Sequence, residues 1–411
     1  MGHWLTSTFA ALESRAYRTF WLGALLSFLG FFMSTIVQSV VAFELSGTNQ
    51  AVGLAIFGQG IAMVILGFVG GALADRVSKR GILFYSQSFV AIVFLAVAVL
   101  LATDRLILPV LVGAAFCVGA SISLLGPARQ AYAPELVPPE RVANAVALNQ
   151  VALNASRVAG PALGFGFLHW ETAGAAGAYF AMTGLYVLAV LTLTALPPPA
   201  ARRRPEVGLL SDVVSGLRYV QDRPRLRLLV LYFLVVIMIG FPYVTVLPGL
   251  VVNALGGDVD SVTGLAALSA VGGLVASLGV ARLADSPRAY LYFWAMGLLF
   301  GGSLIATAAA SSVPMASLGM VGVGIGTGGF QTLNGAVVLR ETEPAYYGRV
   351  MSLTLIAFGA FGLVGLPIGL LADAFGERLT LGGMGLTVCL ISLGLTGVLA
   401  RSHSHRHSRG R

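Results

Sequence analysis

Three polar side chains within one apolar run are the strongest candidates for chemistry in this sequence. Gln150, Asn154 and Arg157 are spaced four and three residues apart, and Pro161 follows four residues later, so all four share one helical face. If this run crosses a membrane, its arginine costs at least about 2.5 kcal/mol to place near the centre and should face a cavity or a partner. We interpret this face as part of a solute pathway. The alternative is that Arg157 makes structural hydrogen bonds to carbonyl groups.

The composition places these side chains in a membrane protein. Of 411 residues, 57% are hydrophobic and only 10% are charged, whereas soluble domains have roughly 25% charged residues. So few charges cannot cover a soluble surface of this size. Only two cysteines are present, Cys117 and Cys389, and both lie in apolar runs. This argues against a disulfide-stapled secreted domain and predicts that both are packing residues.

Twelve apolar runs are long enough to cross a bilayer as helices, which takes about 20 residues each. The runs are 20–43, 51–74, 81–102, 106–128, 142–168, 174–196, 226–252, 262–284, 289–310, 313–339, 350–372 and 379–400. We therefore predict an all-α membrane protein with two six-helix bundles. The predicted division is an N-terminal bundle at 1–196, a cytoplasmic linker at 197–225, a C-terminal bundle at 226–400 and a cytoplasmic tail at 401–411.

The basic residues indicate how the runs are oriented. All of the 25 Lys and Arg residues except Arg105, Arg157 and Arg378 lie at the two ends of the chain or in every second loop. Loops rich in Lys and Arg stay in the cytoplasm, so both termini and the linker are predicted to be cytoplasmic. The expected location is a bacterial cytoplasmic membrane, crossed many times. The net charge of +8 then reflects topology, and nucleic acid is not an expected partner.

The two predicted bundles repeat each other. Three landmarks recur at offsets of 210, 208 and 206 residues: Leu73-Ala74-Asp75 with Leu283-Ala284-Asp285, Arg141-Val142 with Arg349-Val350, and Pro161 with Pro367. Repeats on either side of a basic linker predict two pseudo-symmetric halves related by an axis along the membrane normal. In such a protein a substrate site is expected between the halves, near the midplane.

The segment 71–80 lies in the first predicted cytoplasmic hairpin and reads Gly-Ala-Leu-Ala-Asp-Arg-Val-Ser-Lys-Arg. It resembles motif A of the major facilitator superfamily, except that Ser78 stands where the family usually has glycine. The resemblance implies that this hairpin latches the two halves together in the outward-facing state, against the start of the eleventh run. The residues it assigns to the latch are Gly71, Asp75, Arg76, Lys79, Arg80, Arg129, Glu135 and Arg349.

The resemblance extends along essentially the whole chain. It is carried by Gly-Pro-Ala-Arg-Gln at 126–130, Pro-Glu-Leu-Val-Pro at 134–138 and Gly-Arg-Val-Met-Ser-Leu at 348–353. These segments are similar to the branch of the superfamily that includes enterobactin-exporter-like and macrolide-efflux-like proteins. Gly160, Pro161 and Gly164 also resemble motif C, which is associated with exporters, although Phe165 replaces the second glycine of its usual pair.

Further polar residues lie in runs that line the cavity in this family. The substrate-cavity candidates are Gln38, Gln59, Gln150, Asn154, Arg157, Tyr243, Gln331 and Asn334. Each could instead make a hydrogen bond in helix packing. Proton relays usually use carboxylates inside the membrane, and no Asp or Glu lies near the centre of a run. Glu44, at the outer end of the first run, is the candidate for proton coupling, with an ordinary interfacial charge as the alternative.

Together, the residues and the resemblance predict a secondary transporter and not an enzyme. It is expected to export small amphipathic, drug-like molecules by alternating access, with proton antiport. The expected partners are this substrate, protons and membrane lipids; no cofactor or metal is expected, and the protein is expected to be a monomer. A dedicated siderophore or lipid exporter is an alternative within this class. A non-transporting membrane sensor or scaffold is the alternative from another class.

Overall fold

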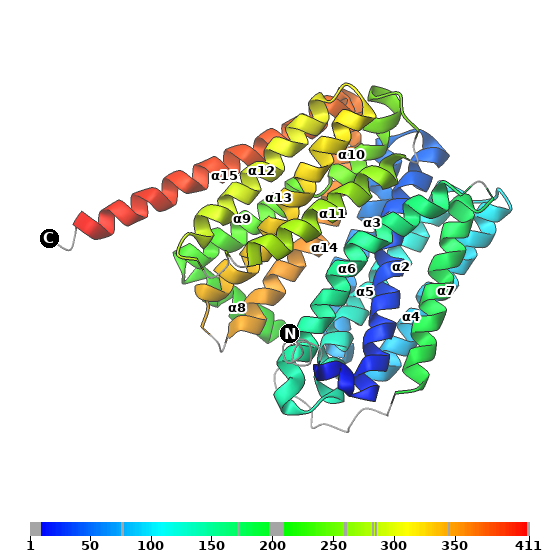
Figure 1. The fold of residues 1–411 in the computed structure, drawn as a ribbon, viewed down its shortest axis with the longest axis horizontal. Helices are drawn as coiled ribbons and strands as arrows, with labels where there is room; N and C mark the ends of the chain where they lie inside the picture. Colours follow the sequence, from blue (N-terminus) through cyan, green and yellow to red (C-terminus); the bar gives the residue numbers. More distant parts are fainter. Residues whose placement is uncertain are drawn as a thin grey trace, which may run out of the picture. The chain divides into compact units, whose positions relative to one another are not determined.

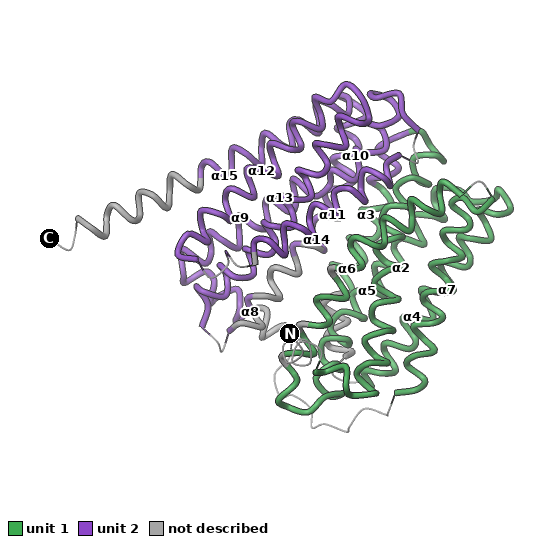
Figure 2. The backbone as a smooth tube through the Cα atoms, viewed as in Figure 1, with its two compact units in different colours: residues 1–47, 54–211 green, residues 48–53, 212–411 purple. Residues whose placement is uncertain are grey.

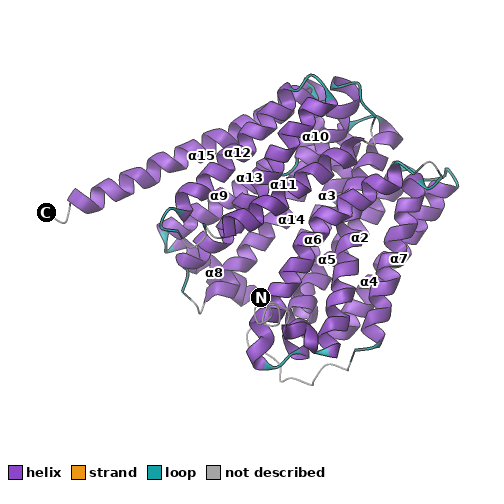
Figure 3. Cartoon of the chain, viewed as in Figure 1, coloured by secondary structure: helices purple, strands orange, loops and turns teal. Residues whose placement is uncertain are grey.

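The computed structural model describes residues 10–74, 78–170, 172–196, 209–258, 261–281, 283, 286–343 and 346–408. Within these ranges nearly every residue is helical and no strand occurs (Figure 3). The chain forms two compact units, shown in Figure 2: unit 1 comprises residues 1–47 and 54–211, and unit 2 comprises residues 48–53 and 212–411. The helix α3 (Asn49–Ala74) therefore begins in unit 2 and continues in unit 1.

Figure 1 shows the helices in the order in which they follow one another along the chain. Unit 1 contains η1 (Ala10–Glu13), α2 (Arg15–Ser46), most of α3, α4 (Lys79–Ala102), α5 (Leu108–Tyr132), η2 (Ala133–Leu136), η3 (Pro139–Arg141), α6 (Val142–Leu168) and α7 (Gly174–Thr194). Unit 2 contains most of α8 (Leu209–Gln221), then α9 (Pro224–Gly240), α10 (Tyr243–Gly249), the π-helical turn η4 (Leu250–Ala254), α11 (Ser261–Ala281), α12 (Ala289–Ala309), α13 (Val313–Arg340), α14 (Tyr347–Phe375) and α15 (Glu377–Ser408).

All twelve predicted apolar runs fall on helical segments, so the all-α prediction is confirmed. Within the described residues, nine helices are long and apolar enough to cross a membrane, and the apolar stretch Gly359–Phe375 is shorter. The seventh run is divided among α9, α10 and η4, where Pro242 precedes α10 and Pro248 lies inside it. Proline removes a helical hydrogen bond and breaks a helix into segments. The number of twelve spans stays a prediction.

The same pairs of helices pack in both units, which confirms the predicted repeat. In unit 1, α2 packs on α6 and α7, and α4 packs on α5 and α7. In unit 2 the corresponding helices, six spans later, pack in the same way: α9 on α14 and α15, and α12 on α13 and α15. Each unit therefore has its own core, and the repeated landmarks Pro161 and Pro367 lie inside the corresponding helices α6 and α14.

Serine caps begin three of the helices. The side chains of Ser14, Ser78 and Ser312 accept hydrogen bonds from backbone N–H groups in the first turns of α2, α4 and α13, which satisfies donors that have no partner inside the helix. Ser78 is the residue that departs from the usual glycine of motif A. Here it has a structural explanation, because its Oγ accepts from the N–H of Gly81 at 3.1 Å.

Large apolar side chains remain exposed along the helices of each unit. Tyr85 on α4, Leu278 on α11 and Leu318 on α13 are 73%, 69% and 76% exposed. By contrast, rings such as Phe293 and Phe330 are fully buried and stack within unit 2, with centroids 4.7 Å apart. Helices that are apolar both inside and outside are typical of a protein whose surroundings are lipid.

Candidate functional site

The helix α6, which carries the predicted polar face, is fastened to α2 by side-chain hydrogen bonds at its beginning. Tyr17 Oη donates to the carbonyl of Ala145 at 2.6 Å, and Trp21 Nε1 donates to the carbonyl of Leu148 at 2.8 Å. The two donors are four residues apart and therefore lie on the same face of α2. These bonds fix the register between α2 and α6 before the polar face begins.

Further along, the two helices come into backbone contact at glycines. A Cβ atom added at Gly160 would lie 2.7 Å from Phe32 Cβ and 2.8 Å from the backbone nitrogen of Met33. One turn later, a Cβ at Gly164 would lie 3.1 Å from Val37 Cγ2. The motif C-like glycines therefore allow a close approach of α6 to α2. Pro161 lies between them, inside α6, where it removes a helical hydrogen bond.

Arg157 lies on α6 less than one turn before Gly160. Its guanidinium carbon is 5.6 Å from the centroid of the Phe32 ring on α2, and the residue is half-buried. Gln150, earlier on the same helix, is exposed, and the side chain of Asn154 lies outside the described residues. Arg157 therefore stays partly accessible while it contacts an aromatic face.

Arg129, near the end of α5, is more deeply buried. The residue is only 5% exposed, and its Nη2 donates to Ser27 Oγ at 2.7 Å. Its guanidinium carbon lies 4.3 Å from the centroid of the Phe28 ring. A cation–π contact contributes about 0.5 to 2 kcal/mol, and a hydrogen bond to a charged group about 1.5 to 3 kcal/mol. Both contacts offset the cost of burying Arg129, and both lie inside unit 1.

The motif A hairpin is described only in part. Asp75 and Arg76 lie outside the described residues, as does the side chain of Arg349, while Gly71 falls in the last turns of α3. The hairpin's Lys79 forms an ion pair of 2.5 Å with Glu135, whose side chain is 8% exposed. The latch assignment therefore stays a prediction.

The next residue of the hairpin is held within unit 1 as well. Arg80 Nη2 donates to the carbonyl of Thr194 at the end of α7, at 3.0 Å. Together with the Lys79–Glu135 pair, this bond joins the beginning of α4 to the segment after α5 and to α7. Two members of the predicted latch are thus tied to neighbouring helices of their own bundle.

The remaining cavity candidates differ in burial. Gln38 on α2 and Asn334 on α13 are buried, at 5% and 3% exposed, and Asn334 Oδ1 accepts no hydrogen bond from the described residues. Gln59, Tyr243 and Gln331 are half-buried. Buried amides inside a membrane bundle are expected to meet a partner or a solute. Glu44, the proton-coupling candidate, is exposed near the end of α2, and its role stays a prediction.

A polar cluster in unit 2 was not predicted. The Asp373 carboxylate, near the end of α14, accepts from the N–H groups of Asn49 and Gln50 at 2.9 and 2.8 Å, and from Asn49 Nδ2 at 3.0 Å. Glu377 accepts from Asn49 Nδ2 at 3.0 Å and from Asn253 Nδ2 at 2.6 Å. Asp373 is therefore an N-terminal cap for α3 supplied by another helix. The sequence signal is the pair of acids at the end of the eleventh apolar run, Asp373 and Glu377.

Glycines allow the first turn of α3 to rest directly on α14. A Cβ at Gly53 would lie 2.4 Å from the carbonyl oxygen of Gly365, and a Cβ at Gly369 would lie 2.5 Å from that of Asn49. The residue Asn49 is 1% exposed as a result. The hydrogen-bonded cluster is thus built on a close backbone contact.

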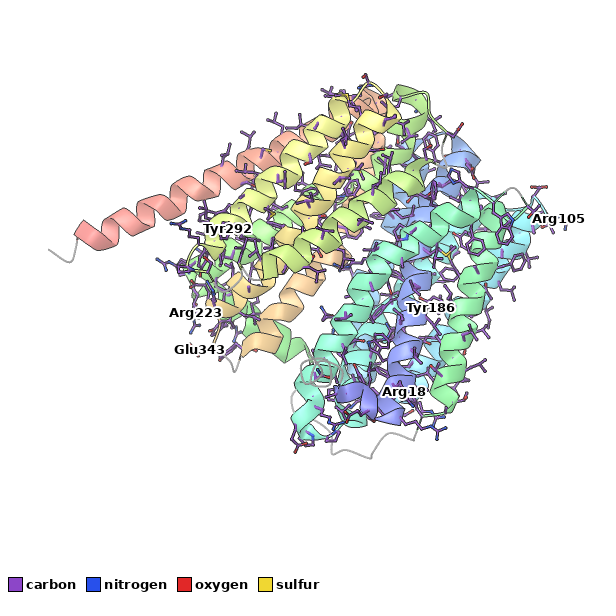
Figure 4. All side chains as sticks on the ribbon, in the orientation of Figure 1. Arg18, Arg105, Tyr186, Arg223, Tyr292 and Glu343 are labelled. Carbon is purple, nitrogen blue, oxygen red and sulfur yellow. The ribbon has the colours of Figure 1, made fainter. Side chains whose placement is uncertain are left out.

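The linker helix α8 is fastened to the segment before α14. Arg223 and Glu343 form an ion pair of 2.5 Å and lie together in Figure 4. The Tyr219 ring stacks on Tyr346 with centroids 4.0 Å apart, and its Oη accepts from the N–H of Glu343 at 2.9 Å.

Figure 4 also shows Arg18 and Arg105 at opposite ends of unit 1. The charge pattern of the loops predicts this separation, because it places Arg18 before the first apolar run and Arg105 in a loop on the opposite side.

Two repeated, all-helical bundles with apolar exteriors and buried arginine and amide side chains define a multi-pass membrane transporter. The chain matches the transmembrane secretion effector family over residues 6–405. It belongs to this family of major facilitator superfamily transporters, which are not enzymes.

Curated relatives are similar over most of the chain. The staphyloferrin A transporter of Staphylococcus aureus is 25% identical over 90% of this chain and 93% of its own length. An uncharacterised transporter of the same superfamily, YfiS of Bacillus subtilis, is 23% identical over 87% of this chain and 86% of its own. The enterobactin exporter EntS of Escherichia coli is 27% identical over 54% of this chain and 53% of its own.

Solved structures show the same fold. A bacterial homologue of the human lysosomal transporter Spinster, in an inward-facing and occupied conformation, has a TM-score of 0.76 at 15% identity, covering 95% of this chain and 97% of its own. A D-xylose–proton symporter has a TM-score of 0.70 at 16% identity, covering 92% and 97%. At such identities the likeness concerns the fold alone.

Proposed function

We propose that the protein exports a small amphipathic molecule from the cytoplasm by alternating access, driven by proton antiport. The observation that carries this proposal is the match to the secretion effector family along nearly the whole chain. The close α2–α6 packing at Gly160 and Gly164 supports it, because the motif C-like segment is the part of the sequence that resembles exporters. A cytoplasmic location of both termini is part of the same proposal.

A siderophore is the second candidate substrate. It is favoured by two relatives whose names specify staphyloferrin A and enterobactin. Drug-like compounds remain the first candidate, since most of the polar groups along the helices are neutral amides and hydroxyls.

The deciding experiment is a substrate screen in an efflux-deficient bacterial host, with drug-like compounds and siderophores in the same panel. Cells that express the chain should accumulate less of at least one compound than cells with an empty vector. Equal accumulation of the whole panel would favour the sensor or scaffold alternative.

The latch proposal predicts that Asp75→Asn slows export about two- to fivefold. An acidic group near a helix N-terminus contributes about 0.3 to 1 kcal/mol, and the asparagine keeps the size but loses the charge. The measurement is the initial rate of export, normalised to the amount of protein in the membrane. Asp104→Asn is the control, because Asp104 is exposed and has a φ of 52° that asparagine also adopts. Equal rates for the two variants would remove Asp75 from the latch.

Proton antiport predicts that a protonophore stops export at an unchanged membrane content of the protein. The proton gradient supplies the driving force in this proposal, and collapsing it leaves only downhill leakage of the substrate. The test follows efflux of a preloaded compound before and after the protonophore is added. Efflux that continues at the same rate with the gradient collapsed would exclude proton coupling, and with it the proposed role of Glu44.

A further inference from the structure

Two arginines of unit 2 meet at the turn between α11 and α12. Arg340, in the last turn of α13, donates from Nη1 to the carbonyl of Ser286 at 2.8 Å. Arg288 follows two residues later in the same turn, and its backbone N–H donates to Ser286 Oγ at 3.1 Å. The Arg340 guanidinium group is thus bonded to a residue two positions from Arg288, so both side chains can reach one small ligand.

The helices α12 and α13 are held together close to this turn. The rings of Phe293 and Phe330 stack with centroids 4.7 Å apart. Tyr290 Oη, in the first turn of α12, donates to the carboxylate of Glu341, which is the residue after Arg340. These contacts fix the beginning of α12 against the end of α13. The packing of the two helices therefore sets the position of Arg340 beside the turn.

The positive charge of these two arginines is not balanced by a neighbouring acid. Arg288 and Arg340 are both exposed, and among the described residues neither of them forms an ion pair. The carboxylate of Glu341 is bonded to Tyr290. A guanidinium group has five N–H donors, and the described contact with Ser286 uses one of those of Arg340. Donors therefore remain for a ligand.

An exposed apolar surface begins next to Arg288 and continues along α12. Leu291, Ala295 and Leu299 follow Arg288 at spacings of three and four residues, and all three are exposed. Residues at these spacings are neighbours on one face of a helix. We call these three residues the α12 stripe. A ligand that is held by the arginines therefore has an apolar surface beside it.

We propose that Arg288 and Arg340 bind the phosphate of an anionic phospholipid, whose acyl chain lies along the α12 stripe. Guanidinium groups bind phosphate oxygens through paired, charge-assisted hydrogen bonds. Basic groups beside transmembrane helices on the cytoplasmic side attract anionic headgroups, and the charge pattern predicts that this end of unit 2 is cytoplasmic. A soluble anion would make no use of the apolar stripe, which favours a lipid. The site is separate from the proposed export function.

The test uses the delipidated, full-length protein in an uncharged detergent and measures lipid binding by native mass spectrometry. The probes are phosphatidylglycerol, phosphatidylcholine with the same acyl chains, and glycerol 3-phosphate, which has a phosphate but no acyl chain. We expect phosphatidylglycerol to bind about fivefold more tightly than phosphatidylcholine, and glycerol 3-phosphate not to bind in the same concentration range. Equal affinity for the two lipids would overturn the proposal. Glycerol 3-phosphate that binds as tightly as phosphatidylglycerol would overturn it in favour of a soluble phosphate compound.

Substitutions assign the lipid to the two arginines. We expect R288Q and R340Q each to weaken phosphatidylglycerol binding about fivefold, since a basic residue near a membrane surface contributes about 1 kcal/mol. R288K should weaken it less, because lysine keeps the charge but not the planar pair of donors. R105Q is the charge-matched control, because Arg105 is an exposed loop residue of unit 1. Its binding of phosphatidylglycerol should equal that of the unsubstituted protein.

Unchanged binding in both R288Q and R340Q would overturn the proposal. Equal weakening in R105Q would overturn it as well, because net charge alone would then attract the lipid. R340Q loses the contact with Ser286 and could aggregate in size-exclusion chromatography; R288Q and R288K decide the question in that case, because Arg288 is an exposed residue. Binding is measured without transport, so a protein that exports nothing in the substrate screen can still support this site.

Discussion

Gly160→Val is expected to abolish transport, because the added atoms would collide with the backbone of α2. The position of a new Cβ lies 2.8 Å from the Met33 nitrogen and 2.7 Å from Phe32 Cβ. Overpacking of this kind costs typically 1 to 3 kcal/mol when side chains can move aside. Here the added atom collides with a backbone atom, so α6 must move away from α2. The hydrogen bonds from Tyr17 and Trp21 to carbonyl groups of α6 oppose this movement.

Gly166→Val is the matched control for this substitution. Gly166 lies on the same helix, and a Cβ there meets nothing within 4 Å, so both variants exchange the same residue types in α6. The measurement is export per unit of protein in the membrane, together with the thermal stability of the purified variants. We expect Gly166→Val to keep most of the export and Gly160→Val to lose it. Comparable export by the two variants would show that the close approach of α2 and α6 is not needed.

Much of the fold follows from the sequence because a bilayer imposes simple requirements. Each span needs about 20 apolar residues, and each backbone group must bond within its own helix. These requirements predict the helical segments and the cytoplasmic loops from run length and charge alone. The repeat could be predicted for a related reason: the landmarks near Asp75 and Pro161 recur near Asp285 and Pro367, and the same helix pairs pack in both units.

The partners of individual side chains could not be predicted in the same way. Periodicity shows which residues share a face, but not which helix that face meets. The resemblance to motif A assigns Arg129 to the latch, but the sequence does not indicate its contacts with Ser27 and Phe28, about 100 residues earlier in the chain. The bond between Asn49 and Asp373 spans 324 residues. Neither end has a local signal that specifies the other.

That long-range bond leads to the second large expected effect. Asp373→Asn should destabilise the first turn of α3 within unit 2, because the amide keeps only one acceptor oxygen and turns a donor toward N–H groups. The carboxylate now accepts from the N–H groups of Asn49 and Gln50. Hydrogen bonds to charged groups contribute about 1.5 to 3 kcal/mol. Because Asp373 is exposed, solvent screening reduces the lost hydrogen-bond free energy to about 1 to 2 kcal/mol. We therefore expect the first turn of α3 to open locally about 5- to 30-fold more often.

Hydrogen exchange of the amides at residues 49–53 measures this opening directly, because local unfolding sets the exchange rate of a protected amide. Asp258→Asn is the control, as an exposed acid in a loop of the same unit. The initial rate of export is measured on the same two variants. Faster exchange at 49–53 together with altered export in Asp373→Asn alone would show that this turn contributes to transport. Unchanged exchange at 49–53 would show that the backbone contacts of Gly53 and Gly369 hold the turn without the carboxylate.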